Sequence, residues 1–190
     1  MYHCKEYEKL KKEYGSYSSW AIWNEYDQED TNVIEKNVEK LNTRYVFVGL
    51  NVSKKLKSPS WSNFHGGKHD RKLTYACSGN KLSGCYITDL FKDIPTTKEC
   101  CLKALVEWDP KILKKNIESF REEMKNIGVN EDTIFIILGN VTKEYFIKYF
   151  QDGHKNNPVY HRHYSSRGKD VAWINELWGK LGINKVFKKD

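Results

Sequence analysis

The feature that most restricts the fold of this chain is a short apolar run, Ile134–Leu138, between Thr133 and Gly139. Its residues do not alternate with polar ones, so both faces of the run must be buried if it forms a strand. Strands buried on both faces are typical of the centre of a parallel sheet, where helices cover each face. The run is far shorter than the roughly 20 apolar residues of a membrane span. We therefore expect an α/β protein without a membrane span.

The remainder of the chain alternates between expected strands and helices. Further strands are expected at Arg44–Leu50, Cys85–Thr88 and Pro158–His161, which are rich in β-branched and aromatic residues. Asp109 and Pro110 are residue types that cap and begin a helix. The expected helices cover residues 68–76, 110–128, 141–150 and 170–181. This alternation predicts a mostly parallel sheet whose functional loops follow the carboxyl ends of its strands.

The first 43 residues are expected to form a helical, aromatic extension to a core of residues 44–182, within one domain of 190 residues. Tyr7, Leu10 and Tyr14 share one face of a Lys- and Glu-rich helix that Gly15 should end. Two tryptophans follow within the next eight residues. The simplest interpretation is that these aromatic side chains pack against the core.

The chain is basic, because 32 Lys and Arg against 25 Asp and Glu give a formal net charge of +7. Such a charge points to a polyanionic partner only if it gathers in one place. The five cysteines form no CxxC pair, so we expect reduced thiols, a cytoplasmic location and no metal site. The first residues carry charges before any apolar run, which argues against a secretory signal. We also expect a monomer without a cofactor.

Residues suited to chemistry follow the first two expected strands. Asn51 comes after Gly49, which permits a sharp turn, and its amide can both donate and accept hydrogen bonds. Phe64 precedes two glycines and could lie flat against a planar ligand. Asp89 is a carboxylate at the end of the second strand. The plainer alternatives are a turn asparagine, a buried loop anchor and a helix cap, respectively.

The loop after the last expected strand is the densest polar group in the chain. It reads His161-Arg162-His163-Tyr164-Ser165-Ser166-Arg167. Two histidines with two serines and two arginines favour a functional site over isolated structural histidines.

The order of these segments resembles that of the uracil-DNA glycosylase superfamily, over roughly residues 44–182. Members of that family carry a Gly-x-(Asp/Asn/Ala)-Pro motif, a base-stacking aromatic residue, a strand ending in Thr-Asn, an apolar strand ending in Leu-Gly and a His-Pro-Ser-Pro-like loop. The segments that match them here are Gly49–Ser53, Phe64, Ile87–Lys92, Ile137–Gly139 and His163–Arg167. The resemblance implies a three-layer α/β/α sandwich around a four-stranded, mostly parallel sheet.

The resemblance also implies roles in breaking the N-glycosidic bond of a base that is flipped out of DNA. Asn51 would position the attacking water, and His163, or alternatively His161, would stabilise the departing base. Phe64 would stack on the base and Asp89 would read its edge. The residues expected to contact the nucleic-acid backbone are Lys54, Lys55, Ser165, Ser166 and Arg167.

The sequence departs from the family pattern at three places. Val52 replaces a proline of the first motif, and Tyr164 and Ser166 replace prolines of the last one. Asp89 replaces the asparagine that reads uracil. An ionised carboxylate only accepts hydrogen bonds, so it opposes O4 of uracil but suits a base with an amino donor, such as cytosine. We therefore expect a DNA glycosylase-like protein that excises or binds a base other than plain uracil.

Two other functions fit the same residues. A catalytically silent nucleic-acid-binding module would bind DNA strongly but would yield no abasic product. An enzyme or binding protein for a free nucleoside or nucleotide would be stabilised by nucleotides and not by DNA.

Overall fold

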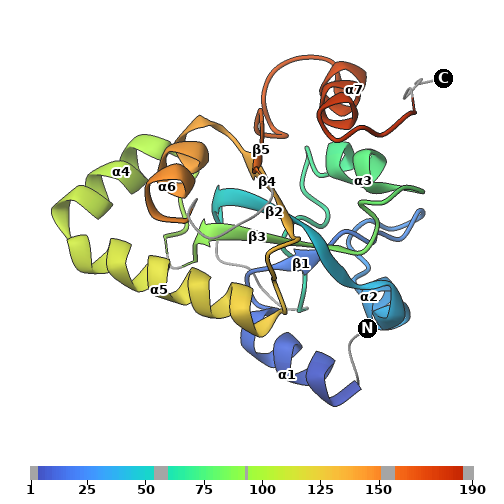
Figure 1. Ribbon diagram of the computed structural model, residues 1–190, viewed down its shortest axis with the longest axis horizontal. Helices are drawn as coiled ribbons and strands as arrows, with labels where there is room; N and C mark the ends of the chain where they lie inside the picture. Colours follow the sequence, from blue (N-terminus) through green and yellow to red (C-terminus); the bar gives the residue numbers. More distant parts are fainter. Residues whose placement is uncertain (1–3, 54–59, 93, 151–156, 186–190) are drawn as a thin grey trace.

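The computed structural model describes residues 4–53, 60–92, 94–150 and 157–185, and Figure 1 shows a central twisted sheet among helices. The strands are β1 (Ser19–Trp20), β2 (Asn42–Asn51), β3 (Cys85–Phe91), β4 (Ile134–Leu138) and β5 (Val159–His161). The helices are α1 (Cys4–Tyr14), α2 (Asn32–Glu35), α3 (Arg71–Cys77), α4 (Glu99–Trp108), α5 (Pro110–Asn126), α6 (Asn140–Phe150) and α7 (Asp170–Lys180), with a 3-10 turn at Val38–Lys40. The predicted α/β class is confirmed.

The sheet has the strand order β1-β3-β2-β4-β5 among the described residues. Strands β3, β2, β4 and β5 run parallel to one another, whereas β1 pairs antiparallel with β3. The prediction of four strands is therefore wrong, because the N-terminal segment, expected to be helical, supplies a fifth. Ser19 pairs with Ile87 and Trp20 with Tyr86. The open main-chain groups along the edge of β3 explain this two-residue strand, which has no periodic pattern of its own.

Two apolar clusters lie on opposite faces of the sheet. Strand β4 contributes Phe135 and Ile137 to one cluster and Ile136 and Leu138 to the other, so both of its faces are buried as predicted. Helices α4, α5 and α6 and the N-terminal segment cover the first face, and α3 and α7 cover the second (Figure 1). Full burial of each large apolar side chain contributes about 1.5–3 kcal/mol. None of the described helices is long and apolar enough to cross a membrane.

The N-terminal aromatic residues pack against the core, as expected. Tyr7, Leu10 and Tyr14 of α1 are each 3 % exposed. Trp61, from the loop after β2, donates its indole N–H to the Tyr7 hydroxyl at 3.1 Å. Segments about 50 residues apart are therefore joined by a buried aromatic contact, since the two rings lie 6.2 Å apart.

Strand β3 is longer than predicted and carries Asp89 inside it rather than in the following loop. The strand continues because Leu90 and Phe91 are buried, and because Phe91 pairs with Asn51 of β2. This burial outweighs the low strand preference of aspartate. Asp89 is therefore a side chain of the sheet itself, which corrects its expected place in a loop.

A buried polar network joins α5 to β3. Glu123 is fully buried, and its Oε1 accepts hydrogen bonds from the hydroxyls of Tyr86 (2.8 Å) and Thr88 (2.7 Å). Its Oε2 lies 2.7 Å from Nζ of Lys92, which is also buried. Lys92 in addition donates to the main-chain carbonyl of Asp89. Because a buried charge is costly without a partner, this ion pair fixes where α5 lies on the sheet.

Candidate functional site

A cleft of ≈ 590 Å³ opens where β2, β4 and β5 end. Its volume lies within the range of about 300–1,000 Å³ that is usual for small-ligand sites. The carboxyl ends of parallel strands are the usual place for such sites in an open α/β sheet. The polar and aromatic residues that line it are Asn51, Ser53, Lys68, His69, Asp70, Thr96, Thr97, Glu99, Thr142, His163, Tyr164, Ser165 and Ser166.

Asn51, the last residue of β2, has an amide group whose orientation is fixed. Its Nδ2 lies 2.8 Å from the carbonyl oxygens of Ile94 and Thr96 and 3.0 Å from that of Val52. The amide nitrogen has only two hydrogens to donate, so these carbonyls occupy it fully. None of the described residues donates a hydrogen bond to Oδ1. Asn51 therefore presents a hydrogen-bond acceptor to a ligand or water in the cleft.

His163, two residues after β5, offers a hydrogen-bond donor, whereas Asn51 offers an acceptor. The backbone N–H of Ser165 donates to Nδ1 at 3.2 Å, and the Ser165 hydroxyl lies 2.7 Å from the same atom. A backbone N–H can only donate, so Nδ1 is unprotonated and the proton of the neutral ring lies on Nε2. Burial, helped by the nearby His69 and Lys72, lowers the pKa of His163 to about 4. At neutral pH His163 is therefore an uncharged hydrogen-bond donor.

The other candidate histidine, His161, lies away from the lining of the cleft. It is buried under α7, where its ring packs on Trp173 with a centroid separation of 4.6 Å. Its Nε2 lies 3.0 Å from the main-chain carbonyl oxygen of Trp173, to which it donates. Burial lowers the pKa of His161 to about 4. Of the two histidines, the structure therefore brings only His163 to the cleft beside Asn51.

Phe64 and Asp89 lie close to each other but are buried outside the lining of the cleft. Oδ2 of Asp89 accepts a hydrogen bond from Nδ2 of Asn63 at 2.9 Å. A Cβ atom at Gly49 would lie 2.2 Å from Asp89 Oδ1 and 3.7 Å from the Phe64 ring, so only glycine fits between them. Burial raises the pKa of Asp89 to about 6, although the Asn63 hydrogen bond and the charge of Lys92 oppose the rise.

Tyr164 stands between these two groups of residues. It lines the cleft, and its ring meets the Phe64 ring edge-on, at 6.0 Å between centroids and 61° between planes. Its ring also lies against that of His163, at 4.3 Å between centroids. Tyr164 therefore lies between the cleft and the buried Phe64 ring.

The residues expected to contact a nucleic-acid backbone are partly placed at the cleft. Ser165 and Ser166 line it, and Arg167 is exposed beside them. Lys54 and Lys55 lie outside the described residues. One nearby lysine has a structural role instead of contacting a ligand, because the buried Lys72 donates to the Ser166 carbonyl at 3.0 Å. That hydrogen bond ties the loop after β5 to α3.

The sequence interpretation missed several lining residues, of which Asp70 and His69 matter most. Asp70 immediately precedes α3, and its Oδ2 accepts the Gly67 N–H at 2.8 Å. Together with Glu99 it supplies the carboxylates among the described lining residues. An acid before a helix usually acts as a cap, and the sequence contains no sign that α3 begins beside the loop after β5. The glycine pair before His69 was the available signal, since it marks a tight loop.

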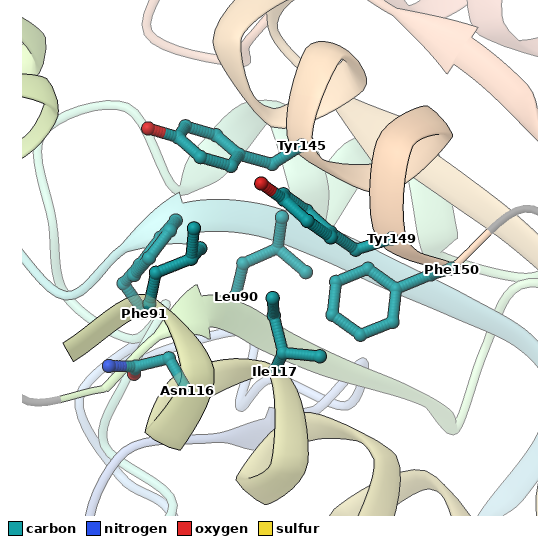
Figure 2. Close-up of a pocket in the computed structure, with 8 residues that line it drawn as sticks. Leu90, Phe91, Asn116, Ile117, Tyr145, Tyr149 and Phe150 are labelled. Carbon is teal, nitrogen blue, oxygen red and sulfur yellow. The ribbon is translucent and has the colours of Figure 1, made fainter. Parts of the chain in front are cut away.

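A small cavity beside Leu90 and Phe91, at the carboxyl end of β3, is too small to bind a ligand. Figure 2 shows Tyr145 and Tyr149 of α6 over Leu90 of β3, with Ile117 of α5 below. Its volume is ≈ 10 Å³, about enough for one water molecule. No cluster of three or more His, Cys, Asp or Glu suited to a metal occurs within the described ranges. Two further clefts, of ≈ 450 and ≈ 440 Å³, lie at the amino-terminal ends of β2 and β4 and between α5 and α6. The cleft beside Asn51 and His163 is the candidate site because it lies at the carboxyl ends of the strands.

Comparisons of the chain with known protein families, with curated protein sequences and with solved structures gave no match. The function must therefore be inferred from the site itself and from the order of its motifs.

Proposed function

We propose that this cleft binds a nucleotide unit of DNA whose base is flipped out, and that it hydrolyses the N-glycosidic bond of that unit. The observation that carries this proposal is the pairing of Asn51 and His163 in one cleft. Asn51 offers a fixed acceptor oxygen, and His163 offers an uncharged Nε2–H donor. Hydrolysis of this bond needs both, because water must be oriented at the sugar while negative charge on the leaving base is stabilised.

The reaction follows from these polarities. A water molecule that donates to Asn51 Oδ1 attacks C1′ of the sugar, the C1′–N bond breaks, and its electron pair leaves with the base. His163 Nε2–H donates to the departing base and stabilises its negative charge. Asn51 cannot take the proton of the water, because an amide is not a base at neutral pH. Asp70 is the carboxylate of the same cleft that we assign to accept it.

The surroundings of the cleft support a polyanionic substrate. Lys68 and the hydroxyls of Ser53 and Ser165 lie on its lining, where they can contact phosphate oxygens without reading sequence. The chain carries a formal net charge of +7, which favours association with DNA. The helices on both faces of the sheet are compatible with the three-layer α/β/α sandwich that the resemblance implies.

The decisive assay measures abasic sites in oligonucleotides that carry a panel of damaged and modified bases, after cleavage by alkali. Asn51→Ala and His163→Ala should each lower the rate by about 100-fold or more, because each removes a group that stabilises the transition state. Asn32→Ala, at an exposed position on α2, is the matched control and should keep the full rate. Full activity in either cleft variant would remove that residue from the mechanism.

The same panel tests the base preference expected from Asp89. Uracil release should be weak or absent, because O4 of uracil would oppose a carboxylate, and an unsatisfied buried polar group costs about 1–3 kcal/mol. A base that bears an amino donor should be preferred. Robust uracil release by the wild type that persists in Asp89→Ala would show that Asp89 does not read the base.

A catalytically silent DNA-binding module is the second candidate, and the position of Tyr164 favours it. In the structure this side chain packs against Phe64, and Phe64 and Asp89 are both buried outside the lining of the cleft, so the expected base-binding residues are closed to a base. Strong, salt-dependent DNA binding without an abasic product would identify this function. Thermal stabilisation by free nucleotides but not by DNA would indicate a small-molecule site instead.

A further inference from the structure

Tyr164 lies against aromatic side chains at the cleft, as a bound aromatic ligand would. Its ring lies against Phe64 at 6.0 Å, within the range of favourable aromatic pairs. Phe64 in turn borders Gly49, whose missing side chain leaves room for the carboxylate of Asp89. Burial, with Asp70 and Asp89 close by, raises the pKa of Tyr164, so its hydroxyl keeps its proton. A planar ring therefore lies edge-on against Phe64, which is itself next to the buried carboxylate of Asp89.

A nucleobase with an exocyclic amino group has this same chemistry, namely a flat aromatic face and a hydrogen-bond donor. We propose that Tyr164 occupies, in the free protein, the position that such a base takes beside Phe64 and Asp89, and that the base enters when this side chain rotates away. This proposal rests on the function proposed above. It makes Tyr164 a specificity-determining residue, since a base must replace its ring contact with Phe64.

The cleft beside Tyr164 offers space into which its side chain can rotate. The side chain already lines the cleft of ≈ 590 Å³, so rotation moves it into open space rather than into the packed core. The backbone on either side is held in place. Ser166 N–H donates to the His163 carbonyl at 2.9 Å, and Lys72 donates to the Ser166 carbonyl at 3.0 Å. The side chain alone can therefore open the position while His163 and Ser165 keep their places.

The test measures binding of free cytosine to the wild type, Tyr164→Ala and Tyr164→Phe by titration calorimetry. The apparent affinity of a site falls in proportion to the fraction of molecules in which it is open. Removal of the ring in Tyr164→Ala should therefore tighten cytosine binding by about tenfold or more. Tyr164→Phe keeps the ring and should bind as weakly as the wild type. Uracil, with a carbonyl in place of the amino group, should gain less than cytosine.

Equal cytosine affinity of folded Tyr164→Ala and the wild type would overturn the proposal. If Tyr164→Ala does not fold, Tyr164→Leu, which keeps part of the apolar contact with Phe64, should show the same gain. Cytosine binding that improves while no variant yields an abasic product would keep Tyr164 in this role and refute the glycosylase. An abasic product from the wild type, with no gain in cytosine binding, would refute only the role of Tyr164.

Discussion

The buried carboxylate of Asp89 should make the stability of the protein depend on pH in a direction opposite to that of most aspartates. Burial raises its pKa to about 6, against an ordinary value of 3.8. Between these two values the folded state therefore holds more protons at this residue than the unfolded chain does. The stabilising contribution of Asp89 is fully present below about pH 4 and is lost as the pH rises through about 6.

The size of the effect follows from the two pKa values. A difference of about two pKa units corresponds to about 3 kcal/mol of folding free energy near neutral pH. In Asp89→Asn the side-chain oxygen can still accept the Asn63 hydrogen bond, but the group can no longer ionise. Its new amide N–H lies where Oδ1 was, beside Gly49, and costs about 1–3 kcal/mol if it lacks a partner. That cost is present at every pH, so the change with pH isolates the ionisation.

The assay is urea unfolding of the wild type and Asp89→Asn at several values between about pH 4 and pH 7.5. The stability of the variant relative to the wild type should improve by about 2–3 kcal/mol over this interval. Asp30→Asn is the matched control, because hydrogen bonds from Asn24 and Asn32 lower the pKa of that half-buried residue's carboxyl. Its relative stability should move in the opposite direction. A difference between Asp89→Asn and the wild type that does not change with pH would refute the argument.

Three further predictions concern other parts of the structure. Glu123→Ala should lower the free energy of unfolding by about 3–5 kcal/mol, because it leaves Lys92 charged and buried. Glu118→Ala, which breaks an exposed ion pair, should change it by less than about 0.5 kcal/mol. Urea unfolding of the two variants measures the difference, and similar losses would contradict the role of the buried pair. Asp109→Ala should lose about 1 kcal/mol in the same assay, since its side chain caps α5 at the Lys111 N–H, 3.0 Å away; an unchanged midpoint would argue against the cap. Because the pKa of His163 is about 4, the pH profile of the rate of base release should show no inflection near pH 6.5 from this residue. An inflection there in the wild type that disappears in His163→Gln would show that the ring titrates in its ordinary range.

Much of the fold could be predicted because its strands carry strong local signals. The run Ile134–Leu138 is apolar on both faces, and the Asp109-Pro110 pair marks a helix start, so β4 and the beginning of α5 were found from sequence. β1 was missed because a two-residue strand has no period, and because it depends on the free edge of β3. The length of β3 was underestimated because Asp89 interrupts an otherwise apolar segment, and its burial depends on neighbours distant in the sequence.

The candidate site was predictable only in part. Asn51 and His163 were found because polar residues just beyond strands gather at one edge of a parallel sheet. Phe64 and Asp89 are buried outside the lining of the cleft by tertiary contacts, among them the edge-on contact of Tyr164 with Phe64, which no sequence pattern encodes. Asp70 was missed for a related reason, since its approach to the cleft follows from where α3 lies against the loop after β5.

The carbonyl groups around the Asn51 amide restrict how this site can change through mutation. A carboxylate at this position would be a stronger base than an amide, and one nucleotide change converts an asparagine codon into an aspartate codon. That carboxylate would, however, set negative oxygens against the carbonyl oxygens of Val52, Ile94 and Thr96, which now accept the amide hydrogens. The single-nucleotide change from Asn51 to aspartate is thus disfavoured as long as the backbone of residues 94–96 keeps its present conformation. Any increase in basicity must arise elsewhere in the cleft, and Asp70 is already placed there.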